Sequence, residues 1–242
     1  MLISYQTWYG GERTPHERFA SAVASAVASR RPPRLCEIGG GAKPLLSLDL
    51  TGRAAVRDYV VTDVSAEELA KAPDGYEKLV ADVTRGHVEG LGSFDLVVSR
   101  TVAEHVSDPA AFHRTVFDML ASGGTAMHFF PTLYEPAFVV NRVLPEALAD
   151  AIVQRIQTNR ARGGSNEKFP AYYRWCRGPT RRQLARLRGI GFEVEEYVGV
   201  FGHGYYHPLA PADRLETALA NVLARHPLPS LTAYAWVALR RP

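Results

Sequence analysis

The chain has 242 residues, of which 46% are hydrophobic and 22% charged, as is usual for a globular α/β domain of this length. No run of about 18 apolar residues could span a membrane, and the first residues lack the charged start and apolar stretch of a secretory signal. A cytoplasmic protein is therefore expected. Its net charge of +3 is mild, and its two cysteines, Cys36 and Cys176, are expected as free thiols because they fit neither a disulfide framework nor a zinc pattern.

The N-terminal segment combines aromatic side chains with a helix start signal. Thr14 supplies an N-cap and Pro15 the first position of a helix that extends to about Ser29. The aromatic residues before it either pack on the core or close over a ligand cleft; they are Tyr5, Trp8 and Tyr9. We treat residues 1–30 as a helical lid on a single domain that spans residues 1–242.

The glycine-rich stretch that follows is the strongest signal in the chain. A short apolar run, residues 34–38, contains the acidic Glu37 and leads into Gly39, Gly40 and Gly41. Glycine has no Cβ, so a ligand can approach the backbone of such a turn closely. We therefore expect a buried strand that ends at a small-molecule site.

Two cofactor classes use a glycine turn of this kind. A dinucleotide-binding fingerprint needs a third small residue, where this chain has Pro44, so that fit is poor. Glu37-x-Gly39-x-Gly41 instead resembles the first motif of class I S-adenosylmethionine-dependent methyltransferases of the small-molecule type, with Lys43 in place of the last glycine. The resemblance implies S-adenosylmethionine as the cofactor, with the turn against its methionine part and the acid supporting the loop or holding the amino group.

Two acidic residues end the next two expected strands. Residues 58–62 form a strand that ends at Asp63, and a capping box at Ser65 starts a helix directly after it. An acid in this position can accept hydrogen bonds from ribose hydroxyls. Residues 78–81 form a third strand before Asp82 and Val83, and the resemblance implies that Asp82 reaches the adenine amino group while Val83 packs on the ring.

The fourth expected strand, residues 93–99, leads into a second match to the family. The sequence from Phe94 through Glu104, His105 and Val106 resembles its F-D-x-V and E-H-V segments. The resemblance places Ser99 and Arg100 beside the cofactor and the acceptor. It indicates a packing and capping role, rather than catalysis, for His105.

The remaining pattern completes an alternating α/β chain. A helix from Asp108 to about Leu120 is expected to end at Ser122-Gly123-Gly124, before a fifth strand over residues 125–130. A short helix over residues 44–50 and further elements at 180–188, 193–201, 211–225 and 231–239 follow the same alternation. We predict a Rossmann-like, doubly wound seven-stranded sheet whose last strand is antiparallel, with ligands at the carboxyl ends of the strands.

Residues 131–179 interrupt this alternation after the fifth strand. They contain an aromatic and basic stretch around Tyr172 and Trp175, and the resemblance implies an acceptor-binding cap. Residues 151–190 carry ten Lys or Arg against one acid, Glu167. This charge is either a solvated helix face or a site for an anionic or phosphorylated acceptor, and nucleic acid is the weaker candidate because no recognition motif accompanies it.

Several residues are candidates for the base that removes a proton from a hydroxyl acceptor. Histidine is the side chain that most often acts as such a base near neutral pH. The candidates are His128, His203, His207 and, in reserve, Tyr172 and Tyr205. No metal is expected, because Ser99 and Arg100 stand where a metal-dependent site would need clustered acids.

The sequence therefore predicts methyl transfer to a small molecule, best taken as a hydroxyl oxygen of a sugar, glycoside or secondary metabolite. An N- or C-methyltransferase, a nicotinamide-dependent reductase and a non-catalytic cofactor-binding accessory protein stay as alternatives. A homodimer is compatible with the sequence.

Overall fold

The computed structural model describes residues 1–31, 33–47, 56–86, 92–133, 170–207 and 210–242. These residues form one eight-stranded sheet in the order β1-β7-β8-β6-β5-β2-β3-β4. The strands are β1 (Leu2–Thr7), β2 (Arg34–Ile38), β3 (Asp58–Asp63), β4 (Glu77–Val80), β5 (Phe94–Arg100), β6 (Leu120–Pro131), β7 (Glu193–Phe201) and β8 (Tyr234–Arg240). Strand β8 pairs antiparallel with both β6 and β7, and every other pairing is parallel. The doubly wound α/β fold with an antiparallel last strand is thus confirmed.

The strand count differs from the predicted seven because the N-terminal residues form an additional edge strand. Strand β1 pairs in parallel with β7, from Leu2 beside Glu196 to Thr7 beside Phe201. Tyr5 stacks on Phe201, with 5.7 Å between ring centroids. The available edge of β7 decides this pairing, and the local sequence of the first residues does not reveal it.

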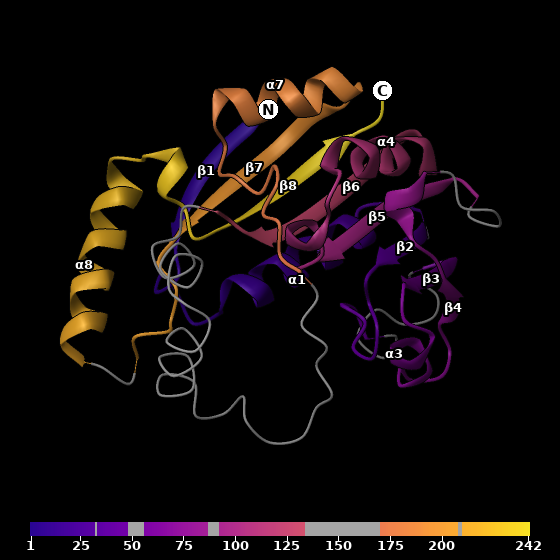
Figure 1. The fold of residues 1–242 in the computed structure, drawn as a ribbon, viewed down its shortest axis with the longest axis horizontal. Helices are drawn as coiled ribbons and strands as arrows, with labels where there is room; N and C mark the ends of the chain where they lie inside the picture. The colour runs from indigo at the N-terminus through magenta and orange to yellow at the C-terminus, as the bar shows by residue number, and fades with distance from the viewer. Residues whose placement is uncertain (32, 48–55, 87–91, 134–169, 208–209) are drawn as a thin grey trace.

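Helices cover both faces of the sheet (Figure 1). The helices are α1 (Pro15–Ala28), α3 (Ala66–Ala70), α4 (Pro109–Met119), α7 (Arg181–Ile190) and α8 (Ala210–Arg225), with 3-10 turns η1 (Val83–Arg85), η2 (Ala103–His105) and η3 (Pro229–Leu231). Helices α4 and α7 share one core with the sheet, while α1 and α3 contribute to the other. Figure 1 shows α8 beyond β1 and both termini near α7.

The two cores follow from the two-residue period of the central strands. Cys36 and Ile38 of β2 belong to the core under α4, whereas Leu35 belongs to the core under α1. Helix α1 buries Phe19, Val23 and Val27, spaced four apart on one stripe. The capping box at Thr14 is present, since Thr14 Oγ1 accepts from Glu17 N and Glu17 accepts from Thr14 N.

Three local predictions differ from the structure. Residues 44–47 are irregular, with a bend at 45–46, rather than the start of a helix, and 48–50 lie outside the described residues. Helix α4 ends at Met119 and β6 begins at Leu120, so Gly123 (φ +78°) lies inside the strand segment and not at a helix end. Within residues 1–30 only α1 is helical, and the lid role of this segment stays a prediction.

Most of the predicted cap, residues 134–169, lies outside the described residues. Its last part, residues 170–179, packs on the α4 face, where the amides of Tyr172 and Tyr173 donate to the Glu104 carbonyl oxygen at 2.7 and 3.0 Å. Both cysteines are buried free thiols, as expected. In the described part of the chain, no helix is long and apolar enough to cross a bilayer.

Candidate functional site

The glycine turn after β2 is held in a conformation that needs glycine. Gly39 has φ +69°, and a Cβ on it would lie 2.4 Å from Val102 Cγ2. A Cβ on Gly40 would lie 2.5 Å from Val61 Cγ1. The amide of Gly39 donates to the Thr62 carbonyl oxygen at 2.7 Å, which ties the turn to the end of β3. The turn therefore presents bare backbone at the carboxyl edge of the sheet.

Glu37 supports this turn from inside the core. Its side chain is buried and accepts hydrogen bonds from the Leu45 amide, at 3.0 and 2.9 Å to the two oxygens, and from the Tyr59 hydroxyl at 2.5 Å. Burial raises the pKa of the Glu37 carboxyl, while these donors oppose the rise. Of the two roles predicted for this acid, the contacts match support of the loop.

A pocket of about 440 Å³ opens beside the turn. The residues that line it include Gly39, Asp63, Asp82, Val83, Thr101 and His105. Asp63 Oδ1 accepts from the Ser65 amide at 3.0 Å, and a Cβ on Gly41 would lie 3.2 Å from Asp63 Oδ2. Asp82 Oδ1 accepts from the Thr84 amide at 3.0 Å. The two carboxylates are thus fixed at the ends of neighbouring strands.

This pocket fits the nucleoside part of S-adenosylmethionine. Asp63 offers acceptors for a ribose diol, Asp82 an acceptor for an exocyclic amine, and Val83 and Val106 offer apolar walls for a ring. Gly39 lines the pocket, and the missing Cβ atoms at Gly39 and Gly40 let Val102 and Val61 pack closely against the turn. Of the residues predicted to bind cofactor, Gly39, Asp63, Asp82 and Val83 line this pocket. Five do not: Glu37, Gly40, Gly41, Ser99 and Arg100.

Ser99 and Arg100 occupy different surroundings although they are adjacent in β5. Ser99 is fully buried, and its Oγ lies 2.7 Å from His128 Nδ1, so Ser99 does not line the pocket. Arg100 is partly exposed and donates from Nη2 to the Lys43 carbonyl oxygen at 3.3 Å. Arg100 thus contacts the loop that follows the glycine turn, and Lys43 takes part in that contact through its backbone carbonyl. The role of Arg100 toward the cofactor stays a prediction.

Thr101 was not anticipated from the sequence. It has φ +56°, an uncommon value for a residue with a β-branched side chain, and its amide donates to the Phe129 carbonyl oxygen at 2.8 Å. Strained backbone of this kind is frequent at ligand sites. No sequence signal reveals it, because threonine is ordinary after a strand.

The predicted base His128 is inside the sheet. Its side chain is 0% exposed, its Nε2 has no hydrogen-bond partner among the described residues, and burial lowers its pKa well below the usual value. His113 lies beside it, with 5.5 Å between ring centroids. An acceptor has no route to this imidazole, which argues against the predicted role.

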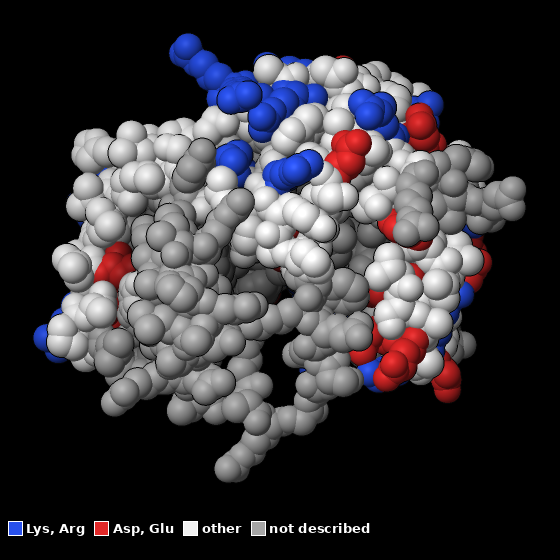
Figure 2. Space-filling view, viewed as in Figure 1, with Lys and Arg blue, Asp and Glu red and all other residues white. Residues whose placement is uncertain are grey.

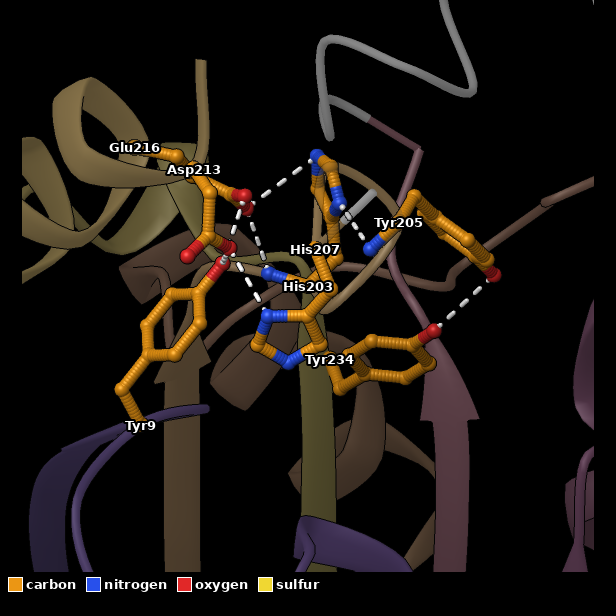
Figure 3. Close-up of polar contacts among 7 residues, drawn as sticks. All are labelled: Tyr9, His203, Tyr205, His207, Asp213, Glu216 and Tyr234. Atoms are coloured by element: carbon orange, nitrogen blue, oxygen red, sulfur yellow. Dashed lines mark hydrogen bonds and ion pairs between the residues drawn. The ribbon is translucent and has the colours of Figure 1, made fainter. Parts of the chain in front are cut away.

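His203 and His207 belong to a hydrogen-bonded group at the carboxyl end of β7 (Figure 3). The buried His203 contacts Glu216 Oε1 through its backbone amide at 2.6 Å and through Nε2 at 3.2 Å, and its Nδ1 accepts from the Tyr205 amide. His207 is 57% exposed, with Nδ1 2.9 Å from Asp213 Oδ1. His203 is therefore a structural residue, whereas His207 is oriented by a carboxylate and accessible.

Tyr9, from the N-terminal segment, is also part of this hydrogen-bonded group. Its hydroxyl donates to Glu216 Oε2 at 2.7 Å and lies 3.2 Å from Asp213 Oδ1. Burial and both carboxylates raise the pKa of the Tyr9 hydroxyl, so it stays protonated. The group thus joins the N-terminal segment to α8. No set of three or more His, Cys, Asp or Glu in the described part of the chain is arranged to hold a metal.

Two tyrosines were predicted as reserve bases, and the role of each stays a prediction. Tyr172 is exposed on the α4 face, and the Tyr205 hydroxyl lies 3.2 Å from the Tyr234 hydroxyl. A histidine missed in the sequence, His16, lies instead among aromatic rings at the carboxyl end of β6. Its ring centroid is 4.6 Å from Phe129 and 5.8 Å from Tyr234. His16 precedes the buried Phe19 by three residues, and this helical spacing was the available signal.

Comparisons with known proteins agree with this geometry. Residues 11–197 match the family model described as a methyltransferase domain. A search of curated protein sequences gave no significant match. The fold and the pocket define a class I methyltransferase that uses S-adenosylmethionine as its cofactor. The chain belongs to the methyltransferase domain family.

Solved structures share the fold at low sequence identity. An S-adenosylmethionine-dependent methyltransferase from Mesorhizobium loti is 19% identical, with a TM-score of 0.55 over 92% of this chain and 98% of that chain. The [4+2]-cyclase SpnF is 18% identical, with a TM-score of 0.55 over 99% and 88%. Haemonchus contortus phosphoethanolamine N-methyltransferase 2, in complex with S-adenosylmethionine, is 16% identical, with a TM-score of 0.51 over 91% and 52%. These likenesses concern the fold alone.

Proposed function

We propose that this methyltransferase acts on a hydroxyl oxygen of a small ring-bearing acceptor, with a sugar or glycoside as the leading candidate and His16 as the base. The observation that carries the proposal is the environment of His16. Burial, and then the positive charge of Arg100, lower the pKa of its imidazole from the ordinary value of 6.5. A neutral imidazole is the form that accepts a proton.

Aromatic side chains around His16 support a ring-bearing acceptor. Trp8 lies 6.3 Å from His16 and 5.4 Å from Tyr234, measured between ring centroids. The hydroxyls of Tyr205 and Tyr234 are 3.2 Å apart. Aromatic faces with polar tips suit the apolar face and the hydroxyls of a sugar.

In the proposed reaction, some residues bind the cofactor and another removes the proton of the acceptor. Bound S-adenosylmethionine supplies an electrophilic methyl group. Asp63 and Asp82, which line the pocket, hold the nucleoside end, and Arg100, which contacts the Lys43 carbonyl oxygen, binds the carboxylate of the cofactor. His16 accepts the acceptor's hydroxyl proton at a ring nitrogen, while the rings around it exclude water.

The test is release of S-adenosylhomocysteine by purified protein with sugars and glycosides, phenols, amines and carboxylic acids, with the product identified by mass spectrometry. We expect turnover with a hydroxyl compound. His16→Ala should lower kcat by about 100-fold or more and leave S-adenosylhomocysteine affinity unchanged. The rate should fall with decreasing pH only below about 6.5, because the pKa of His16 is depressed.

Two variants make this test specific. His226→Ala changes an exposed histidine at the end of α8 and should have no effect. His207→Ala distinguishes the oriented His207 from His16 as the base. Methylation of an amine, or full turnover by His16→Ala, would contradict the proposal. If turnover were lost in His207→Ala but kept in His16→Ala, His207 would be the base instead.

A further inference from the structure

A second pocket, of about 490 Å³, lies on the α4 face of the protein. It is lined by residues 107–110 at the start of α4 and by Arg174, Trp175, Arg177 and Arg186. Val106 lines the cofactor pocket and Ser107 lines this one, so the two pockets adjoin along one short segment. Nothing in the proposed methyl transfer uses this second pocket.

Arg174 and Arg186 bring donors to the pocket that no described acid neutralises. Arg174 donates from Nη1 to the Ser107 carbonyl oxygen at 2.9 Å, and Arg177 donates from Nη1 to the Tyr173 and Cys176 carbonyl oxygens. In the part of the chain that the structure describes, Arg174 and Arg186 have no ion pair with an acid. Each guanidinium has five N–H donors, and the described residues accept a hydrogen bond from one nitrogen of Arg174 and one of Arg186.

Trp175 is fixed between two neighbours. His113 stacks on it at 5.9 Å with an interplanar angle of 19°, and the Arg186 guanidinium carbon lies 5.3 Å from its ring centroid. Trp175 and Tyr173 have φ values of +60° and +51°, and such strained backbone persists only where the surroundings hold it. The Tyr197 hydroxyl donates to the Arg177 carbonyl oxygen at 2.7 Å and anchors the same segment. The pocket is therefore preformed.

One carboxylate, Asp108, opposes the positive charge. It is exposed and caps α4, with Oδ1 accepting from the Ala111 amide at 2.9 Å. Among the described residues that line the pocket, three are arginines and one, Asp108, is an acid. More Lys and Arg side chains gather over α7, at the top of the face in Figure 2. Arg182 and Arg177 contribute, after burial, to a lowered pKa of Arg186, as expected where like charges crowd.

We propose that this pocket binds the phosphoryl group of a small phosphorylated molecule. Arginine forks match phosphate oxygens in paired hydrogen bonds, and guanidinium groups from two different segments suit a tetrahedral dianion better than a planar carboxylate. Trp175 is partly exposed and lines the pocket, so the part of its indole that His113 and Arg186 leave uncovered offers apolar contact to a ring attached to the phosphate. The site is separate from the acceptor position beside His16 and does not depend on the proposed reaction.

Titration calorimetry at low ionic strength with inorganic phosphate, phenyl phosphate and phenol tests the site. Phenyl phosphate should bind saturably and tighter than inorganic phosphate, and phenol should not bind. Arg174→Gln and Arg186→Gln should each weaken binding about tenfold, the loss expected for one charge-assisted contact. Asp108→Asn keeps the helix cap and should strengthen binding several-fold.

The matched control is Arg188→Gln, which removes an exposed arginine of α7 outside the pocket. It should leave phosphate affinity unchanged. An equal loss in Arg188→Gln would show diffuse charge attraction and overturn the proposal. The proposal would also be overturned if the wild-type protein did not bind phenyl phosphate. It would be overturned as well if an RNA oligonucleotide bound much more tightly and its binding depended on Arg188 as strongly as on Arg186. Inorganic phosphate bound as tightly as phenyl phosphate would overturn the role of Trp175.

Discussion

Two buried glutamates, Glu37 and Glu104, differ in whether their carboxyl oxygens have hydrogen-bond donors. Both carboxyl oxygens of Glu37 accept hydrogen bonds, and the residue supports the glycine turn. Glu104 is 5% exposed, and its Oε2 has no hydrogen-bond partner among the described residues. Burial raises the pKa of the Glu104 carboxyl to about 8. Glu104 therefore holds the segment at Tyr172 through its backbone, while its side chain is costly to ionise.

Glu104→Gln should change how stability depends on pH. The carboxyl is protonated more readily in the folded protein than in the unfolded chain, so its contribution to the free energy of unfolding falls as pH rises from about 4.5 to about 8. The wild-type protein should lose a few kcal/mol relative to Glu104→Gln across that range, since one pKa unit corresponds to about 1.4 kcal/mol. Urea unfolding at pH 5 and pH 8 measures the difference.

The control is Glu195→Gln, which changes an exposed glutamate of β7. It should follow the wild-type pH dependence. Identical pH dependence of Glu104→Gln and the wild-type protein would show that Glu104 ionises normally in the fold.

At the scale of elements, the glycine turn after β2 both packs against a neighbouring segment and lines the cofactor pocket. Gly39 contacts Val102 so closely that a Cβ has no space, and its positive φ is unfavourable for other residues. Val102 precedes η2, which adjoins the same pocket. A side chain on the turn would therefore disturb two walls of the cofactor site together.

Gly39→Ala should destabilise the protein by about 1 to 3 kcal/mol, the usual cost of strained backbone, and weaken S-adenosylhomocysteine binding. Gly189→Ala is its matched control, because a Cβ on this α7 glycine meets nothing within 4 Å. That change should be neutral or stabilise by up to about 1 kcal/mol. Denaturant unfolding and calorimetry measure both quantities, and a Gly39→Ala variant with wild-type affinity would refute the close approach of ligand to this turn.

At the scale of the whole molecule, the parallel strands bring distant segments to one edge of the sheet. The carboxyl ends of β2, β3 and β5 border the cofactor pocket, and Phe129, near the end of β6, packs against His16. The antiparallel β8 brings Tyr234 to the same edge, because its first residue pairs with Pro131. Ligand binding at this edge should therefore be linked to cooperative unfolding of the sheet.

S-adenosylhomocysteine at about 100 times its Kd should stabilise the folded protein by about 2.7 kcal/mol, seen as a rise in Tm. Asp63→Ala should require a higher ligand concentration for the same rise, with a loss of about 1 to 3 kcal/mol in binding free energy for the unmade hydrogen bonds. Asp74→Ala, an exposed acid outside the pocket, is the control. An unchanged concentration dependence in Asp63→Ala would remove Asp63 from the cofactor site.

The sequence by itself determined the glycine turn, the alternating α/β order and the acids at the strand ends, because glycine geometry, two-residue alternation and capping boxes are local properties. The methyltransferase family followed from the same stretches. Tertiary structure alone decided the rest. It paired β1 with β7, buried His128 against Ser99, and placed His16 among aromatic rings. It also brought Arg174 and Arg186 to one pocket. Burial and strand pairing depend on contacts between residues far apart in the chain, and the local sequence does not show which of these residues will be in contact.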